Sequence, residues 1–247
     1  MEIHPFLAEF IGSAILLFLG NGVVANLNLN KTYGYQQSPI LLIAFAWGFA
    51  VFVAAFVTSQ SSGAHLNPAV TLGLAIVGKF SWDLVLIYFF SQLSGAMFGT
   101  WLTYLFYIDH YRITENENVI RSTFCTAPAI RNLKNNIFSE ILGTFILVFG
   151  VICIVSPNIE IENSNVQNFG IGSLESLPVG ILIIVIGMAL GGTTGYAINP
   201  ARDFGPRLVY SLLPRKNKKP DWSYSFVPVL GPFIGAILAS LLFNLIT

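Results

Sequence analysis

The chain has 247 residues, of which 54% are hydrophobic and only 10% are charged, and its formal net charge is zero. A soluble domain carries roughly a quarter charged residues, so this composition excludes an ordinary soluble protein and indicates a membrane protein. The balance between 12 basic and 12 acidic residues also argues against nucleic acid as a partner.

Six apolar runs are long enough to cross the hydrocarbon core of a bilayer, which needs about 20 helical residues. In chain order they cover residues 5–27, 40–59, 84–108, 137–155, 177–190 with a glycine-rich extension, and 224–246. Because no basic segment or cleavage site precedes the first run, we expect it to be a span of the mature chain. The pattern predicts an all-α membrane protein with six transmembrane helices.

Two shorter segments, 63–79 and 191–213, separate the second span from the third and the fifth from the sixth. Each is too short to cross a bilayer and carries one copy of the tripeptide Asn-Pro-Ala. The copies are Asn67-Pro68-Ala69 and Asn199-Pro200-Ala201. Asparagine is a favoured helix N-cap, and proline fits the first helical position. The sequence therefore predicts two half-membrane helices whose N-termini meet at the bilayer midplane, where the asparagine amides could donate to a passing hydroxyl or water.

The two tripeptides lie 132 positions apart (199 − 67), and similar segments around Glu9 and Glu140 lie 131 apart (140 − 9). Each half of the chain thus contains three spans and one half-helix. Because three is odd, the second half must be inserted upside down, which brings the half-helices together from opposite faces. We predict one channel domain over 1–247, made of inverted repeats 1–108 and 137–247 that the loop 109–136 joins. Small residues at four-residue spacing allow close helix packing: Gly95/Gly99, Gly187/Gly191 and Gly231/Gly235.

Irregular backbone is expected before each tripeptide, with its carbonyl groups along a pore. The residues concerned are Gly63, Ala64, His65 and Leu66 in the first half, and Gly195, Ala197 and Ile198 in the second. Such backbone is tolerated at membrane depth only where it lines a cavity. We expect His65 to contribute its carbonyl, with its ring packed. Each half-helix start carries about half a positive charge, so two facing starts would repel cations and protons.

The charged residues within these membrane segments include Glu9, Glu140, Arg202 and Asp203. A charge at that depth costs several kcal/mol unless it meets water or a partner. We interpret Arg202 as a donor at the narrowest point of the pore; the alternative is a structural ion pair with Asp203. A proton relay is one hypothesis for the two glutamates. We favour the other, in which each carboxylate accepts N–H bonds from the irregular loop of its own half.

Together these features resemble the major intrinsic protein family, the aquaporins and glycerol facilitators. The resemblance is closest to bacterial glycerol uptake facilitators, through residues 62–70 and 195–207. An aspartate after the arginine, here Asp203, is what the glycerol branch shows. The resemblance implies an aquaporin-like right-handed bundle of six transmembrane helices plus two half-membrane helices. It also implies a homotetramer in the lipid of the cytoplasmic membrane, with both termini cytoplasmic.

The resemblance further implies a narrow filter formed by Trp47, Gly187, Tyr196 and Arg202. Water channels typically place histidine at the position of Gly187, so the glycine is expected to leave the bore wide. Trp47 and Tyr196 would form apolar walls for the carbon chain of an alditol, while Arg202 faces its hydroxyls. Many bacterial glycerol channels have phenylalanine where this chain has Tyr196. We expect the extra hydroxyl either to narrow the lumen slightly or to favour more polar solutes such as urea.

The distribution of basic residues disagrees with the orientation that the family implies. That topology places only Lys79 in an inside loop and puts the following residues outside: Lys31, Arg112, Arg121, Arg131, Lys134, Arg215, Lys216, Lys218 and Lys219. The positive-inside rule alone predicts the opposite orientation. We expect the family topology, because the placement of loops and half-helices is tied to the fold.

We therefore predict a passive channel for glycerol, related small uncharged solutes and some water, which excludes ions and protons. The alternative within the same fold is a mainly water-selective channel, against which Gly187 and Asp203 argue. A proton-coupled secondary transporter is a third reading, because transporters also use inverted repeats and broken helices. No nucleophile–base pair, phosphate loop or metal-ligand spacing is present in the sequence, so we expect no catalytic residue, metal or cofactor.

Overall fold

A computed structural model describes residues 3–36, 39–154, 158–159, 167–168 and 172–247. Within these ranges six helices are long and apolar enough to cross a membrane, which confirms the six predicted spans. They contain α1 (Pro5–Asn28), α2 (Ile40–Ser62), α4 (Val85–Phe106), α7 (Leu133–Cys153), α8 (Leu177–Leu190) and α10 (Val227–Ile246), and the spans that contain α4 and α8 begin earlier, at Trp82 and Gly172. Short 3-10 turns precede two of them: η1 (Trp82–Leu84) before α4 and η2 (Gly172–Ser176) before α8.

Helix α7 begins at Leu133, earlier than hydropathy predicts, because its first turn is polar. Asn132 caps this turn, and its side chain accepts a hydrogen bond from the backbone N–H of Asn135. A cap of this kind stabilises a helix start without adding apolar character. Hydropathy therefore placed the start of the span at residue 137, inside the helix.

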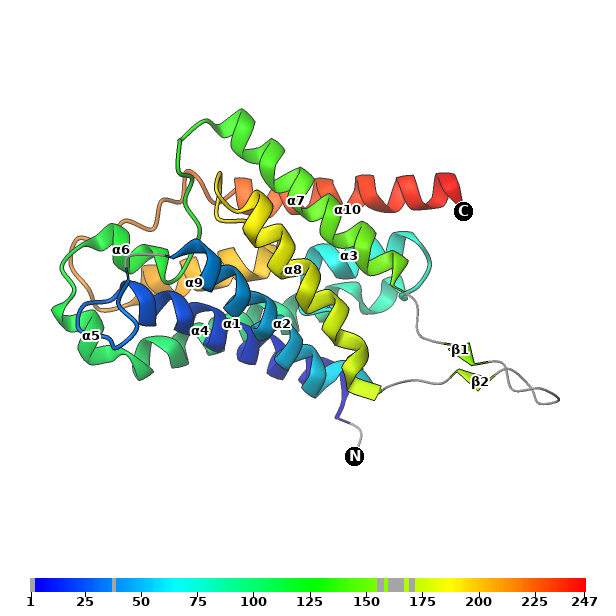
Figure 1. The fold of residues 1–247 in the computed structure, drawn as a ribbon, viewed down its shortest axis with the longest axis horizontal. Coiled ribbons are helices and arrows are strands. Elements are labelled where there is room, and N and C mark those ends of the chain that lie inside the picture. The colour runs from blue at the N-terminus through cyan, green and yellow to red at the C-terminus, as the bar shows by residue number, and fades with distance from the viewer. Residues whose placement is uncertain (1–2, 37–38, 155–157, 160–166, 169–171) are drawn as a thin grey trace.

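The two predicted half-helices are α3 (Pro68–Ile76) and α9 (Pro200–Leu212). Each begins at proline, and each is capped by the preceding asparagine. Asn67 Oδ1 accepts from the backbone N–H of Ala69 at 2.9 Å, and Asn199 Oδ1 accepts from that of Ala201 at 3.0 Å. Figure 1 shows α3 and α9 on opposite sides of the middle of the bundle.

The linker between the halves contains two short helices, α5 (Ile108–Ile113) and α6 (Glu117–Ser122), where the sequence suggested only a polar loop. Asn116 caps α6 by accepting from the N–H groups of Asn118 and Val119. Two short antiparallel strands, β1 (Asn158–Ile159) and β2 (Gln167–Asn168), lie between α7 and α8. Both chain termini lie toward the end of the bundle that carries β1 and β2, away from α5 and α6 (Figure 1).

Equivalent glycine pairs bring helices into backbone contact in both halves. A β-carbon on Gly95 or Gly99 of α4 would lie 2.2 or 2.1 Å from a backbone oxygen of α1. A β-carbon on Gly235 of α10 would lie 2.4 Å from the Ile141 carbonyl oxygen of α7. Because no side chain fits at these points, α4 packs on α1 as α10 packs on α7.

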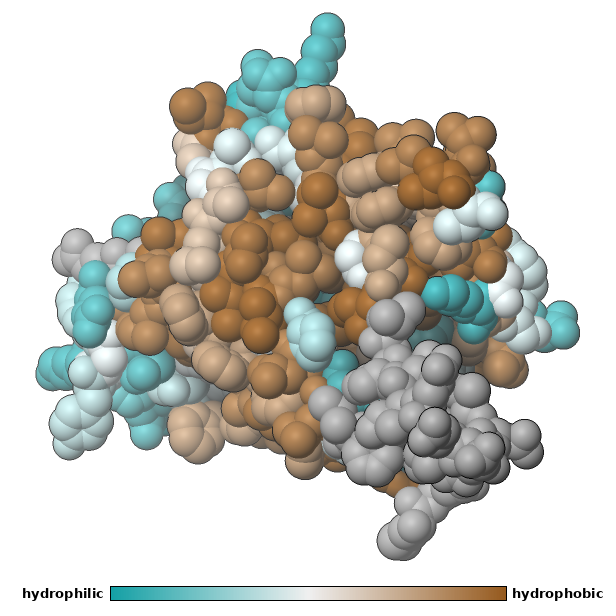
Figure 2. Space-filling model, turned by 45° about the vertical axis from the view of Figure 1, so that its right-hand side comes forward, coloured by the Kyte–Doolittle hydropathy of each residue, from teal (hydrophilic) through white to brown (hydrophobic). Residues whose placement is uncertain are grey.

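Large apolar side chains cover the outside of the bundle. Leu86 and Phe90 of α4, for example, are 66% and 68% exposed. Figure 2 shows hydrophobic residues across the middle of one face and hydrophilic residues gathered toward its margins. An exposed apolar surface of this extent fits lipid and not water. The chain is a multi-pass membrane protein.

Candidate functional site

A cavity of about 320 Å³ runs between the two half-helix regions and is lined from both halves of the chain. The predicted pore residues that line it are Trp47, Gly63, Ala64, His65, Leu66, Asn67, Tyr196, Ala197, Ile198, Asn199 and Arg202. Those that lie behind this lining are Pro68, Ala69, Gly187, Gly195, Pro200 and Ala201. The structure therefore brings the two tripeptide regions and three of the four filter residues to one cavity.

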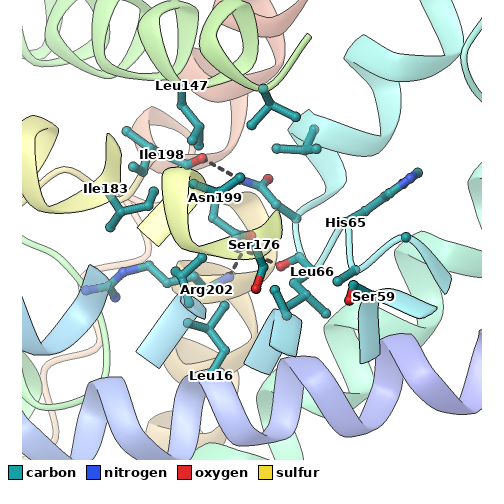
Figure 3. A pocket seen from close by; sticks show the side chains of 18 of the residues that line it. Leu16, Ser59, His65, Leu66, Leu147, Ser176, Ile183, Ile198, Asn199 and Arg202 are labelled. Carbon is teal, nitrogen blue, oxygen red and sulfur yellow. Dashed lines mark hydrogen bonds between the residues drawn. The ribbon is translucent and has the colours of Figure 1, made fainter. Parts of the chain in front are cut away.

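Apolar residues that the sequence analysis did not select complete the wall. Leu16 of α1, Leu147 of α7 and Ile183 of α8 face the cavity (Figure 3). Ser59 and Ser176 also line the cavity, although the hydroxyl oxygen of Ser59 is buried. Hydropathy could not have identified these aliphatic residues, because an apolar side chain that faces a pore has the same hydropathy as one that faces lipid.

The two asparagines hold the halves together at the middle of the cavity. Asn67 Nδ2 donates to the Ile198 carbonyl at 2.8 Å, and Asn199 Nδ2 donates to the Leu66 carbonyl at 2.9 Å (Figure 3). Each side-chain oxygen caps its own half-helix, as described above. A primary amide has two N–H donors. The second donor of each asparagine has no partner among the described residues and remains for a molecule in the cavity.

The backbone before each asparagine adopts the left-handed conformation at non-glycine residues. The φ angles are 49° at Ala64 and 52° at Leu66, and 37° at Tyr196 and 42° at Ile198. This conformation costs on the order of 1–2 kcal/mol for a residue with a β-carbon. The same strained path recurs in both halves, so it must be stabilised by neighbouring groups.

Glu9 and Glu140 supply that stabilisation. Glu9 accepts the backbone N–H groups of His65 at 2.9 Å and Leu66 at 2.8 Å. Glu140 accepts those of Ala197 at 3.0 Å and Ile198 at 2.9 Å. Both glutamates are buried. Their carboxylates are occupied by donors from the loop of their own half, which is the structural role favoured from the sequence over a proton relay.

Further side chains complete the first-half network. Glu9 also accepts from Ser62 Oγ and Gln92 Nε2, both at 2.7 Å. Gln92 donates in addition to Thr71 Oγ1 at 2.9 Å. The ring of His65 packs against Phe80 and Tyr88, while its Nδ1 lies 3.1 Å from Thr71 Oγ1. Gln92 was not among the residues predicted from the sequence, although a glutamine inside an apolar span is a signal that could have identified it.

Arg202 lies against an aromatic ring and not against the neighbouring aspartate. Its guanidinium carbon is 4.2 Å from the ring centroid of Trp47. Among the described residues its side chain has no hydrogen-bond or ion-pair partner, so its donors are available to a molecule in the cavity. The alternative of an ion pair with Asp203 is wrong. Consecutive helical residues point about 100° apart, which turns Asp203 away from Arg202.

Asp203 instead pairs with Arg207, one turn further along α9. The two side chains are 2.7 Å apart and fully buried. The guanidinium of Arg207 also donates to the carbonyls of Thr126 and Asp221, at 3.0 and 3.1 Å. Asp203 accepts from the Thr126 backbone N–H and hydroxyl. This pair ties α9 to the loops that contain Thr126 and Asp221. The sequence predicted a supporting role for Asp203, whereas Arg207 was not among the predicted site residues.

Tyr196 fills the space left open by two glycines, Gly187 on α8 and Gly191 directly after this helix. A β-carbon on Gly187 would lie 2.8 Å from Tyr196 Cζ, and one on Gly191 would lie 2.6 Å from Cδ1. The Tyr196 hydroxyl is buried and has no hydrogen-bond partner among the described residues. The structure thus turns this hydroxyl away from water, whereas the sequence led us to expect it in the lumen. The ring occupies the space beside Gly187.

Comparisons with known proteins agree with this architecture. The family model described as "Major intrinsic protein" matches residues 2–243. The chain is 47% identical to the glycerol uptake facilitator protein of Streptococcus pneumoniae, over 98% of this chain and 99% of that protein. It is 45% identical to a probable glycerol uptake facilitator protein of Thermotoga maritima, over 97% of each. The X-ray structure of the aquaglyceroporin from Plasmodium falciparum matches with a TM-score of 0.81 at 31% identity, over 97% of this chain and 94% of that one.

Proposed function

Because this chain belongs to the major intrinsic protein family, we propose that it is a passive channel for glycerol, related small uncharged solutes and some water. The full-length similarity to glycerol uptake facilitators supports glycerol as the solute, and such proteins are channels and not enzymes. The observation that carries the proposal is the contact between Arg202 and Trp47. It puts an unoccupied donor and an apolar wall at one point of the cavity.

Glycerol has a hydroxyl on every carbon, so a pore for it needs an apolar surface together with donors and acceptors. Trp47 and Tyr196 offer the apolar walls, and Arg202 offers N–H donors to the hydroxyls. At the middle, the second amide N–H of Asn67 and of Asn199 donates to a hydroxyl. Carbonyls of the irregular loops accept. The solute exchanges water for these bonds stepwise, in single file.

Cations and protons are excluded by the fields of the half-helices. Each helix N-terminus carries about half a positive charge, and α3 and α9 both start at the middle of the cavity. The oxygens of Asn67 and Asn199 are turned to their own helix starts, so the amides present donors to the pore. A cation would meet positive potential and no free amide oxygen there.

The two alternative functions fit the geometry less well. A mainly water-selective channel has a narrower and more polar ring of filter residues around the pore. Gly187 contributes no polar side chain to such a ring. A proton-coupled transporter would need Glu9 or Glu140 to release and take up protons. Both carboxylates are instead buried and occupied by donors.

The proposal extends to topology and assembly. The matching contacts of α4 with α1 and of α10 with α7 support inverted repeats 1–108 and 137–247, joined by 109–136. The placement of both termini toward one end of the bundle (Figure 1) supports a common side for them, which we assign to the cytoplasm. We assign a homotetramer with one pore per subunit, embedded in the lipid of the cytoplasmic membrane.

Stopped-flow light scattering on proteoliposomes tests the function. After a glycerol shock, we expect shrinkage followed by rapid re-swelling whose rate is linear in glycerol and unaffected by a proton gradient. A non-permeant sugar gives the water permeability of the same vesicles. Water flow without glycerol re-swelling would leave the water-selective channel as the better reading. Accumulation driven by the proton gradient would favour the transporter.

Two substitutions test the filter assignment in the same assay. Arg202→Ala should loosen the exclusion of cations. Cation leak across the vesicle membrane is measured with a cation-sensitive dye enclosed in the vesicles. Gly187→His should lower glycerol flux more than water flux, because a side chain there displaces the Tyr196 ring toward the bore. Gly192→His is the matched control, since a β-carbon on Gly192 has no neighbour within 4 Å. Equal glycerol flux in the two histidine variants would contradict the assigned filter.

A further inference from the structure

The indole of Trp47 lies directly on the backbone of α1. A β-carbon on the buried Gly20 would lie 2.4, 2.5 and 2.6 Å from Cζ3, Cη2 and Cε3 of Trp47. Three neighbouring ring atoms at nearly one distance place that β-carbon over the face of the ring and not at its edge. Carbon atoms normally approach to about 3.5–4.0 Å. Only a glycine at residue 20 allows the ring to lie where it does.

The opposite face of the same ring carries Arg202. The guanidinium carbon is 4.2 Å from the ring centroid. Because Gly20 occupies one face, the guanidinium lies on the other. The order across this wall of the pore is therefore the α1 backbone, Trp47 and the Arg202 guanidinium. The thickness of this stack decides how far Arg202 and the indole reach into the bore.

The indole has no other direction in which to retreat. Trp47 is only 4% exposed. The next residue, Gly48, locks α2 against α8, since a β-carbon there would lie 2.3 Å from Ile184 Cγ1 and 2.5 Å from the Gly180 carbonyl oxygen. A group added between α1 and the ring must therefore move the ring toward Arg202 and the pore.

We propose that Gly20 is a positioning residue that sets the width of the filter and so admits an alditol besides water. It touches no solute and acts through Trp47. The inference rests on the proposed glycerol channel. A methyl group at residue 20 requires the indole to shift by about 1 Å to restore normal carbon contacts. Glycerol is wider than water, so its flux falls more.

The chain provides a matched control on the same helix. Gly22 lies two residues further along α1, and a β-carbon there has no neighbour within 4 Å. Gly22→Ala adds the same methyl group to α1 without contacting Trp47. A second control is Trp47→Phe, whose smaller ring lacks the outer indole atoms that Gly20 contacts.

The experiment compares glycerol and water permeability in proteoliposomes for wild type, Gly20→Ala, Gly22→Ala, Trp47→Phe and Gly20→Ala/Trp47→Phe. We expect Gly20→Ala to lower the glycerol-to-water permeability ratio on the order of tenfold. Gly22→Ala should keep the wild-type ratio. The double variant should have the ratio of Trp47→Phe alone, because the added methyl group then meets no indole.

An unchanged ratio in folded Gly20→Ala protein overturns the proposal, as does an equal loss of both permeabilities. If Gly20→Ala folds only together with Trp47→Phe, the clash lies at the indole as proposed. Failure to fold in both backgrounds overturns it. The wild-type permeabilities are measured first. If wild-type protein passes water but no glycerol, the proposed function itself fails, independently of the variants.

Discussion

The regions around Asn67 and Asn199 have the same backbone path but different side-chain support. Both contain left-handed residues before the asparagine, a carboxylate that holds the loop, and an asparagine that reaches the other half. In the first half, Thr71 Oγ1 accepts a hydrogen bond from the neutral side chain of Gln92. At the equivalent place in the second half, Asp203 pairs with the buried Arg207.

This difference distinguishes the features that both strained loops require from those that are present in one half only. The strained loop needs a carboxylate in both halves, because its N–H groups have no helical partners there. The ion pair of the second half anchors the loops that contain Thr126 and Asp221, and the described residues of the first half contain no equivalent ion pair. Three of the four proposed filter residues, Gly187, Tyr196 and Arg202, also come from the second half. The features that both halves share form the strained loops, and the features of the second half alone include most of the proposed filter.

The largest effect is expected where the halves differ most. Asp203→Ala leaves the buried guanidinium of Arg207 without its counter-charge, which costs about 3–5 kcal/mol of unfolding free energy. Thr71→Ala, the matched change in the first half, removes neutral hydrogen bonds worth about 1 kcal/mol each. Thermal unfolding of the two variants in detergent checks the order. A less stable Thr71→Ala variant would contradict this comparison.

A smaller and nearly equal effect is expected where the halves agree. Glu9→Gln and Glu140→Gln each turn an amide N–H₂ group toward a backbone N–H donor. One unsatisfied buried donor costs about 1–3 kcal/mol. Both variants should therefore be destabilised by similar amounts in the same unfolding assay, with no change in the pH dependence of glycerol flux. A pH-dependent loss of flux in one variant alone would reopen the proton-relay hypothesis.

The smallest effect is expected at the Tyr196 hydroxyl. This group is buried without a hydrogen-bond partner among the described residues and faces away from water. Tyr196→Phe should keep glycerol and urea permeability within about twofold of wild type. It should also leave stability unchanged or raise it slightly, because an unpaired buried hydroxyl is unfavourable. A large change in the glycerol-to-urea ratio would place the hydroxyl in the lumen, as the sequence first suggested.

The sequence by itself determined the six spans, the two half-helices and the repeated tripeptides. These depend on apolar length, on N-capping by asparagine and on proline at the first helical turn, all of which are local properties. Only the tertiary structure decided which side chains meet across the chain. It paired Asp203 with Arg207, set Trp47 against Gly20 and buried the Tyr196 hydroxyl beside Gly187. Such contacts depend on how helices that are distant in sequence pack, which no local pattern records.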